Sequence, residues 1–399
     1  MSDSGKDCGT PPRALFVTTV PVTLWSFLLP LAKALRAEGW RVDALSGFSG
    51  GVRPDLKGPP DWEQAFDELH SVKWSRSVRS FLRYRRLARE IRSLVIDGGY
   101  RVVHTHTPIA SLITRLALRK VGGVRVIYTA HGFHFYRGQH RRLQGWLFRR
   151  AEQYCARFTD LLVVMNDEDE GAAHELVAFA PRCEVVRIDG VGIDLDDYVP
   201  PVLGAEREAE LRDEYQLPED SYVVGMIAEL NDNKRHRLAL YAARLLKQSH
   251  PRLRWLFIGS GPVEQALRIR VNAERLPVTF AGQVDATRLR ELFALIDLGI
   301  LVSEREGLPR SLMEFSAAGI PIAGTRTRGI IDEVRDERAL AAGSAGDGGV
   351  GGGALAEVVG RIADDAGLAV ELAASQKAYA REHFALDVIL PKYLALYIV

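Results

Sequence analysis

The chain has 399 residues, 47% of them hydrophobic and 26% charged, which is enough apolar material for two domains with separate cores. Its three cysteines, Cys8, Cys155 and Cys183, are too few and too scattered for a disulfide framework or a zinc site, and no apolar stretch is long enough to span a membrane. The net charge of +1 conceals 28 basic against 21 acidic residues in positions 1–194 and 24 against 30 thereafter, so the two halves are expected to bind different partners.

The first half of the chain alternates apolar segments of strand length with helical stretches. Its polar start lacks a hydrophobic signal core, so we expect a cytoplasmic protein. Strands are predicted at residues 14–19, 41–45, 101–106, 124–129 and 161–165. Strands separated by helices indicate βαβ units and a parallel sheet.

A linker at residues 198–204, which contains two prolines and a glycine, separates this series from a second one. Further strands are predicted at residues 222–227, 255–258, 278–280, 298–302 and 320–323. The pattern predicts an α/β protein whose two doubly wound parallel-sheet domains, residues 1–199 and 200–383, face each other across a cleft. We expect a last helix, at about 384–399, to pack back on the first domain.

Two glutamates eight residues apart, Glu306 and Glu314, follow the apolar strand at 298–302. A helix is predicted from Pro309 to Gly319, which places both carboxylates near the carboxyl end of the strand, where open α/β sheets bind ligands. Amides at the helix start favour a phosphate, and carboxylates suit sugar hydroxyls, so the segment indicates a nucleotide-sugar site. The alternative is that Glu314 pairs with Arg310 four residues earlier and that Glu306 is a solvated loop residue.

Two other patterns resemble metal sites. His104 and His106 stand two apart on one strand, but without a third ligand nearby a zinc site is a poor interpretation. The acidic runs 166–170 and 194–197 offer magnesium ligands, yet Asn166 followed by acids also suits a helix N-cap with a charged first turn. We therefore expect no required metal.

Residues 71–92 are strongly basic. The cations are Lys73, Arg76, Arg79, Arg83, Arg85, Arg86, Arg89 and Arg92, and Val78, Phe81, Leu82, Leu87, Ile91 and Leu94 form an apolar stripe at helical spacing. A second basic and aromatic stretch covers residues 141–150. The stripe suits a helix that packs on the core, and the cationic face predicts docking on anionic lipid, at about 1 kcal/mol per cation near the surface. Nucleic acid is a poorer partner because no recognised binding module accompanies the cations.

Several separated segments together resemble the retaining glycosyltransferases of family four. The matching segments are residues 103–108 (VHTHTP), 128–136 (YTAHGFHFY), 189–194 (DGVGID), 228–234 (AELNDNK), 257–262 (FIGSGP) and the Glu306/Glu314 pair. The first two are most similar to the branch that builds bacterial polysaccharides and lipid-linked oligosaccharides. The resemblance covers nearly the whole chain and implies the GT-B fold of two facing Rossmann-like domains.

By this resemblance the donor is expected to be a nucleoside diphosphate sugar, a uridine one by the family's usage, held mainly by the second domain with no cofactor. Lys234 is expected on the diphosphate, where an ammonium neutralises the charge that builds on the leaving group. Glu306, with Gly307, Leu308 and Pro309 around it, is expected to hold the sugar hydroxyls.

The resemblance assigns three further positions. Glu314 is expected to accept hydrogen bonds from the ribose, Val284 to lie near the base, and His131 to face the sugar from the first domain. Alone, His131 would be interpreted as a packed loop histidine. Glu306, His131 and Lys234 are thus the expected catalytic residues.

One position departs from the family. Many relatives carry an arginine where this chain has Glu229, so the diphosphate site loses a cation. Arg235, Arg310 or Arg328 are the candidates to replace it, and Glu229 is otherwise structural.

The resemblance implies transfer of an N-acetylhexosamine or related hexose from a uridine diphosphate sugar to a hydroxyl, with retention of configuration and no assigned general base. A polyprenyl-linked glycan and a small molecule are both open as acceptors. A peripheral site on the inner face of the plasma membrane follows from the lipid hypothesis. The alternatives are an epimerase or hydrolase of the same fold, which only product analysis separates, and a non-catalytic sugar-nucleotide-binding subunit.

Overall fold

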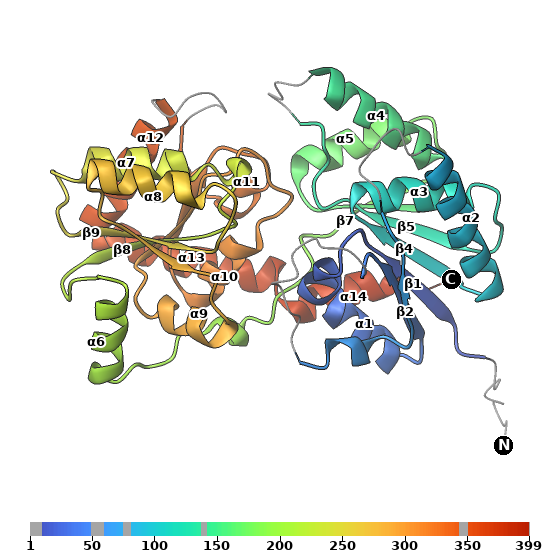
Figure 1. Cartoon of the computed structure of the whole chain (residues 1–399), viewed down its shortest axis with the longest axis horizontal. Helices are drawn as coiled ribbons and strands as arrows, with labels where there is room; N and C mark the ends of the chain where they lie inside the picture. The colour runs from blue at the N-terminus through green and yellow to red at the C-terminus, as the bar shows by residue number, and fades with distance from the viewer. Residues whose placement is uncertain (1–9, 49–59, 75–80, 137–141, 343–349, 399) are drawn as a thin grey trace.

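The computed structural model describes residues 10–48, 60–74, 81–136, 142–342 and 350–398. Two α/β lobes lie side by side, and the chain passes between them near the linker and again near its carboxyl end (Figure 1). Four residues of the predicted basic stretches lie outside the described residues, namely Arg76, Val78, Arg79 and Arg141.

The first lobe contains a parallel sheet with strand order β3-β2-β1-β4-β5-β6-β7. The strands are β1 (Arg13–Val17), β2 (Arg41–Ser46), β3 (Leu69–Ser71), β4 (Val102–His106), β5 (Arg125–Thr129), β6 (Leu161–Val164) and β7 (Glu184–Arg187). The helices are η1 (Leu24–Leu28), α1 (Leu29–Ala37), η2 (Trp62–Ala65), α2 (Phe81–Asp97), α3 (Pro108–Leu118), α4 (Arg142–Ala156) and α5 (Asp167–Val177). Because alternate strand residues point to opposite faces, Phe16 packs toward α1 while Leu15 and Val17 pack toward α2 and α3.

The second lobe repeats this plan with strand order β10-β9-β8-β11-β12-β13. Its strands are β8 (Tyr222–Ile227), β9 (Leu253–Ile258), β10 (Val278–Gly282), β11 (Leu298–Leu301), β12 (Ile322–Thr325) and β13 (Leu340–Ala341). Its helices are η3 (Asp196–Tyr198), α6 (Ala205–Glu214), η4 (Asp232–Lys234), α7 (His236–Leu246), α8 (Glu264–Glu274), α9 (Ala286–Phe293), α10 (Arg310–Ala318), α11 (Ile330–Glu333), η5 (Glu337–Ala339), α12 (Val350–Asp364) and α13 (Ala366–His383). One continuous buried cluster joins both faces of this sheet to its helices.

The last helix, α14 (Leu386–Ala395), lies against the first lobe beside α1 (Figure 1). Ile389, Tyr393 and Tyr397 belong to the same buried cluster as Leu28 and Leu31. The two passages between the lobes are hydrogen-bonded to each other, since the Ile193 amide donates to the Phe384 carbonyl and the Leu386 amide to the Ile193 carbonyl, both at 2.9 Å.

The predicted fold class is confirmed, and each predicted strand coincides with an observed one within a few residues. The strands β3, β7 and β13 were not predicted, because their sequences, LHS, EVVR and LA, contain at most two consecutive apolar residues and are hard to distinguish from loops. The predicted start of α10 at Pro309 is wrong by one residue: Pro309 has an extended ψ of 109° and is the N-cap. Gly319, with φ of 78°, ends the helix as predicted.

None of the helices within the described ranges has both the length and the apolar character that a membrane span requires.

Candidate active site

The strongest contact among the predicted residues joins Lys234 and Glu306. The Lys234 ammonium donates to Glu306 Oε1 at 2.6 Å, and the side chains are 21% and 12% exposed. Lys234 lies on η4, which follows β8, and the Asn231 side chain caps this turn by accepting from the Lys234 amide at 3.1 Å. The interpretation of Glu306 as a solvated loop residue therefore does not describe its side chain.

Sheet topology explains why these two loops meet. From β8 the strand order runs to β9 and β10 in one direction, and from β11 to β12 and β13 in the other. The loops that follow β8 and β11 therefore diverge at a topological switch point, where open α/β sheets bind ligands. They are tied together there, because the Glu304 amide donates to the Asn233 carbonyl at 2.7 Å and Asn233 Nδ2 donates to the Arg305 carbonyl at 3.1 Å.

His131 reaches this point from the other lobe. Its loop follows β5, and its Nε2 lies 3.1 Å from Nδ1 of His106, while the Phe27 ring lies 5.6 Å away. A Cβ built on Gly307 would lie only 2.4 Å from the His131 carbonyl oxygen, so the two loops touch through backbone. A Cβ built on Gly132, which has φ of 102°, would lie 3.0 Å from the Gly307 Cα. Glycine is required on both sides of this contact.

Arg328 binds the lobes together. Its guanidinium donates to Asp169 Oδ1 at 2.8 Å and to the carbonyls of Phe133 and Glu306 at 3.0 Å. Arg328 and Asp169 are both buried, and burial raises the pKa of Asp169 although Arg328 opposes that shift. The same interface contains a bond from Asn166 Nδ2 to the Gly307 carbonyl at 2.8 Å.

The guanidinium of Arg310 is also held by hydrogen bonds within the protein. It donates through Nε to Glu314 at 3.0 Å, through Nη2 to the Tyr198 hydroxyl at 2.8 Å, and to the Ser26 carbonyl. The Arg310–Glu314 pair that the sequence offered as an alternative is thus present. Burial raises the pKa of Glu314, and Arg310 opposes that shift.

Of the three arginines considered as replacements at the phosphate, Arg235 is the one whose side chain makes no hydrogen bond to a described residue. It follows Lys234 in a left-handed conformation with φ of 52°, and it is half-buried. Burial lowers its pKa, and Glu304 opposes that shift. Its guanidinium lies two residues along the chain from Asn233, which contacts the loop after β11.

The other predicted binding positions lie around the same edge of the second sheet. Val284 is partly buried against the core between β10 and α9. Leu308 and Pro309 immediately precede α10. Glu229 follows β8 and accepts from Asn231 Nδ2 at 3.0 Å. That bond is consistent with a structural role for Glu229.

Burial keeps three histidines of the first lobe, His104, His106 and His131, neutral. Burial lowers the pKa of His104 to about 3 and of His131 to about 4, and it lowers that of His106 well below its usual value. His131 is a third histidine beside the pair, which the sequence did not place there. The two ring nitrogens of His104 already bond to the hydroxyls of Tyr397 and Thr129, each at 2.7 Å, so the rings do not converge on one metal position.

A different group has the spacing of metal ligands. Asp43, Glu68 and His70 each offer one ligand atom, and these atoms lie within 4.8 Å of one another. Arg13 and Tyr100 both donate to Asp43 Oδ2 at 2.6 Å, and Arg41 pairs with Glu68. The Arg13 and Arg41 cations neutralise the two carboxylates. The group lies near the amino ends of the strands, away from the Lys234–Glu306 contact.

The acidic run at 166–170 acts as a cap. The Asn166 side chain accepts from the Asp169 amide at 2.8 Å, and α5 begins at Asp167. The N-cap interpretation is confirmed, but the contacts of Asn166 and Asp169 with the second lobe were missed. Their partners, Gly307 and Arg328, are more than 140 residues away, and no local pattern indicates such pairs.

Comparison with known families gives two consecutive matches. Residues 24–189 match the profile of the glycosyl transferase 4-like domain, and residues 207–383 match that of glycosyl transferases group 1. EpsD of Bacillus subtilis, named as a glycosyltransferase, is 32% identical over 334 residues, which cover 81% of each chain.

Two further similarities concern nucleotide sugars. An Escherichia coli enzyme named UDP-Gal:alpha-D-GlcNAc-diphosphoundecaprenol alpha-1,3-galactosyltransferase is 23% identical over 229 residues, 56% of this chain and 57% of its own. The crystal structure of Anabaena HepE in complex with UDP and glucose superposes with a TM-score of 0.73 at 17% identity, covering 96% of this chain and 98% of that one.

Proposed function

We propose that this chain, which belongs to the group 1 glycosyltransferases and has the GT-B fold, transfers a hexose or N-acetylhexosamine from a uridine diphosphate sugar to a hydroxyl of a lipid-linked acceptor. The observation that carries the proposal is the contact between Lys234 and Glu306 at the switch point of the second sheet, opposite His131. Cation, carboxylate and neutral imidazole are the groups that a sugar diphosphate needs.

On the donor side, binding exchanges one ion pair for two better-matched contacts. The Lys234 ammonium moves from Glu306 to a diphosphate oxygen, and the freed carboxylate accepts hydrogen bonds from the sugar hydroxyls. Arg235 supplies the second cation that Glu229 does not. Because charge develops on the departing diphosphate as the glycosidic bond breaks, cations fixed beforehand at that position stabilise the transition state.

On the acceptor side, His131 contacts the donor sugar as a neutral imidazole. Retention follows if the acceptor oxygen attacks the anomeric carbon on the face from which the diphosphate leaves. The bond from that carbon to the diphosphate oxygen breaks, the new carbon–oxygen bond forms, and the acceptor proton passes to the departing phosphate oxygen. This route needs no protein base, and we assign none.

The relatives support the choice of donor. The E. coli relative is named for UDP-Gal, and the HepE crystals contain UDP and glucose. The name of that E. coli relative also specifies a diphosphoundecaprenol-linked sugar as acceptor. EpsD, which is more similar to this chain than the E. coli relative is, is named as a glycosyltransferase. The name of the E. coli relative supports a role in extending a lipid-linked glycan. The proposed donor class is therefore a uridine diphosphate hexose.

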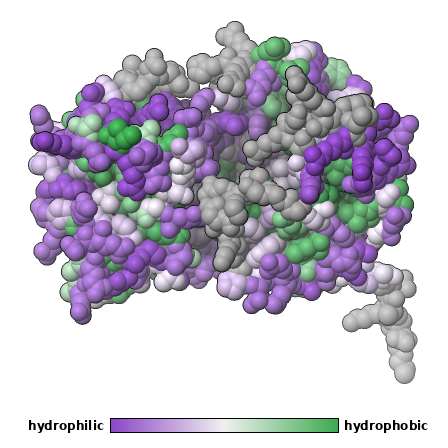
Figure 2. Space-filling model, viewed as in Figure 1, coloured by the Kyte–Doolittle hydropathy of each residue, from purple (hydrophilic) through white to green (hydrophobic). Residues whose placement is uncertain are grey.

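The outer helices of the first lobe support a lipid-linked acceptor. On α4, Leu143, Trp146 and Leu147 are 73%, 53% and 54% exposed, and Arg150 lies 5.5 Å from the Trp146 ring. Figure 2 shows hydrophobic atoms among hydrophilic ones at the top of the molecule, where α4 lies in Figure 1. An exposed tryptophan beside arginines is typical of the boundary between water and lipid.

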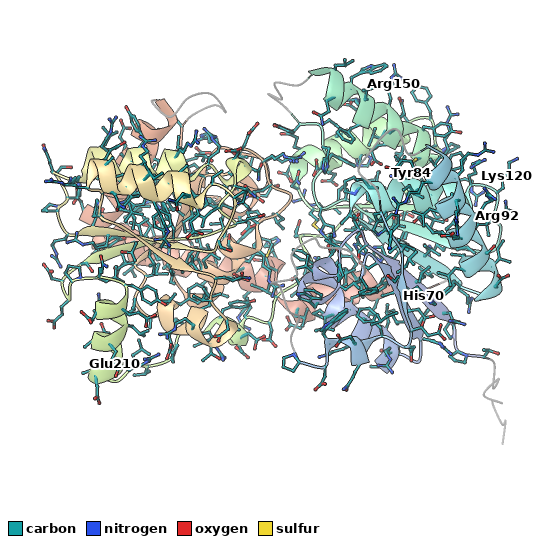
Figure 3. All side chains as sticks on the ribbon, in the orientation of Figure 1. His70, Tyr84, Arg92, Lys120, Arg150 and Glu210 are labelled. Carbon is teal, nitrogen blue, oxygen red and sulfur yellow. The ribbon has the colours of Figure 1, made fainter. Side chains whose placement is uncertain are left out.

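The cations of α2 extend this surface. Exposed side chains there are Arg83, Arg85, Arg86, Arg89 and Arg92, while Leu87 and Ile91 pack into the core. Arg92, Lys120 and Arg150 all point away from the sheet on the side that α2, α3 and α4 cover (Figure 3). We propose that this side docks on anionic lipid during transfer; the placement at the inner face of the plasma membrane is part of the same proposal.

The test is a donor screen by calorimetry, followed by product analysis with a polyprenyl diphosphate-linked N-acetylhexosamine as acceptor. We expect one uridine diphosphate sugar to bind, and its sugar to appear on the acceptor with unchanged anomeric configuration. Glu306→Gln should bind the nucleotide yet lose transfer. Free sugar or an epimerised donor as the main product supports the alternative enzymes, and donor binding without turnover on any acceptor supports a non-catalytic subunit.

A further inference from the structure

Strand β4 carries two buried histidines that the proposed function does not use. His104 and His106 occupy alternate positions and therefore share one face of the strand, with ring centroids 4.2 Å apart and an interplanar angle of 33°. Neither is exposed. Phe16 meets both rings edge-on at 5.9 and 6.2 Å, so His106 is held in a fixed orientation.

The side chain of His106 makes one hydrogen bond in the described part of the chain, to the ring of His131. His106 Nδ1 lies 3.1 Å from His131 Nε2, and His106 Nε2 is buried with no partner among the described residues. No hydrogen bond from a described residue reaches His131 Nδ1. That atom is the ring nitrogen of His131 available to a substrate.

The bond between His106 and His131 has two tautomeric forms. Both rings are neutral because they are enclosed, so one nitrogen of the pair carries the proton and the other accepts. If His131 donated, His106 would keep its proton on the buried Nε2, where no acceptor receives it. If His106 donates, only a lone pair is left without a partner at that atom, and buried donors are left unpaired more rarely than buried acceptors.

We propose that His106 is a positioning residue that donates its Nδ1 proton to His131 Nε2 and so fixes the proton of His131 on Nδ1. His131 then presents an N–H donor to an oxygen of the donor sugar. The proposal rests on the proposed function in one respect, namely that His131 contacts the sugar. The His104 ring, held by the hydroxyls of Thr129 and Tyr397, supports the His106 ring by stacking.

This arrangement gives a reason for the spacing of the motif. The first histidine binds the hydroxyl of Tyr397, which follows α14, and the second reaches His131 after β5. One strand thus connects the returning end of the chain with the candidate active site. The role of each histidine differs even though both are buried.

The first experiment is ¹⁵N nuclear magnetic resonance of histidine-labelled protein, with the His131 signals identified by their loss in His131→Gln. We expect a protonated Nδ1 and an unprotonated Nε2 in the wild type. In His106→Leu, which has no polar atom, the His131 proton should move to Nε2. A wild type with the proton on Nε2, or a tautomer unchanged in His106→Leu, overturns the proposal.

A matched pair of variants separates positioning from packing. Asparagine is close in size to leucine but places an amide N–H near the position of Nδ1, so His106→Asn should retain the Nδ1 tautomer of His131. If His106→Leu does not fold, His106→Gln replaces it, because its amide lies near the position of Nε2 and cannot reach His131. The exposed His174→Asn is the control for labelling and purification.

The second readout is turnover. We expect kcat to fall about tenfold or more in His106→Leu, the cost of one misdirected hydrogen bond, and to return to within a few-fold of the wild type in His106→Asn. Equal losses in both variants would assign His106 to packing alone. The two proposals fail separately: absence of transfer with any donor contradicts the proposed function, whereas the tautomer of His131 is measured without substrate.

Discussion

The two lobes share one topology but present opposite chemistry at their switch points. Between β1 and β4 the side chains are neutral: the Thr19 and Thr107 hydroxyls lie 2.7 Å apart, and His104 and His106 are buried beside them. Between β8 and β11 they are ionic, with the Lys234–Glu306 contact. The comparison teaches that the fold supplies two equivalent edges, at the carboxyl ends of the two sheets, that differ in charge; under the proposed function this difference decides which of them binds the diphosphate.

Backbone strain distinguishes the edges as well. Thr107 has φ of 65° and ψ of 134°, a conformation that is rare for a β-branched residue. It is held there by the Thr19 amide, which donates to its hydroxyl at 3.0 Å. Strain of this kind is a feature of functional sites, and it marks the neutral edge as the acceptor side of the proposed reaction.

The largest expected effect concerns the ion pair that joins the lobes. Arg328→Ala leaves the buried Asp169 carboxylate without its cation, so we expect a loss of about 3–5 kcal/mol in the free energy of unfolding. Arg252→Ala breaks an exposed pair with Asp220 and should cost less than about 1 kcal/mol. Urea unfolding of both variants measures the difference. Similar losses would show that Arg328 is not a buried link between the lobes.

The contact between glycines gives the next effect. A methyl group in Gly307→Ala would lie 2.4 Å from the His131 carbonyl oxygen. It would therefore force apart the two loops, one from each lobe, that carry these residues. We expect about a 100-fold loss of transfer, the usual result of a displacement near 1 Å between reacting groups. Gly171→Ala, on α5 with no atom within 4 Å of the new methyl, is the control and should be fully active. Full activity of Gly307→Ala would mean that the edges need not touch.

Much of the second lobe was predictable because its signals are local. The apolar run before Glu306 indicates a strand, and Gly319 marks the end of the helix that follows. Lys234 and Glu306 were predicted to share one site, and they do share one contact. Their roles in binding and transfer stay proposals.

The links between the lobes were not predictable, for a physical reason. Arg328 and Asp169, and likewise Tyr136 and Glu304, are paired across 159 and 168 residues, and the Tyr136 hydroxyl donates to Glu304 at 2.8 Å. Such pairs depend on how two finished sheets pack, which no period or turn signal encodes. The same holds for Tyr397 and His104, which are 293 positions apart.

A smaller effect follows from a buried acid behind Glu306. Burial, with the nearby Glu306, Asp332 and Glu314 carboxylates, raises the pKa of Glu333 well above its usual value of 4.5. The folded protein therefore keeps this proton at pH values where the unfolded chain has released it, so stability falls as pH rises from about 4.5 toward the folded pKa.

Glu333→Gln should remove that part of the slope, which is at most about 1.4 kcal/mol per pH unit. The measurement is urea unfolding of wild type and variant at several pH values from about 4.5 to about 7.5. Glu382→Gln, exposed on α13, should leave the slope unchanged. Parallel stability curves for wild type and Glu333→Gln would contradict a neutral Glu333.

The smallest effect per side chain is expected on the side of the first lobe that we propose docks on lipid. Replacing Arg83, Arg86 and Arg89 with glutamine should weaken binding to anionic vesicles by about 1 kcal/mol per cation, and Trp146→Ser should weaken it further. The control is a triple glutamine variant with the same change in charge at exposed arginines away from α2, namely Arg252, Arg275 and Arg381. Sedimentation at low salt measures binding, and equal losses in both triple variants would reject a specific docking side.

The most direct test of the central claim is calorimetric binding of UDP to the wild type and to Lys234→Met. Removing the ammonium from a charge-assisted contact should weaken UDP binding by about 10- to 100-fold, while Lys247→Met, a variant of an exposed lysine on the same lobe, should bind as the wild type does. If UDP binds Lys234→Met as tightly as the wild type, the ionic edge between β8 and β11 is not the diphosphate site.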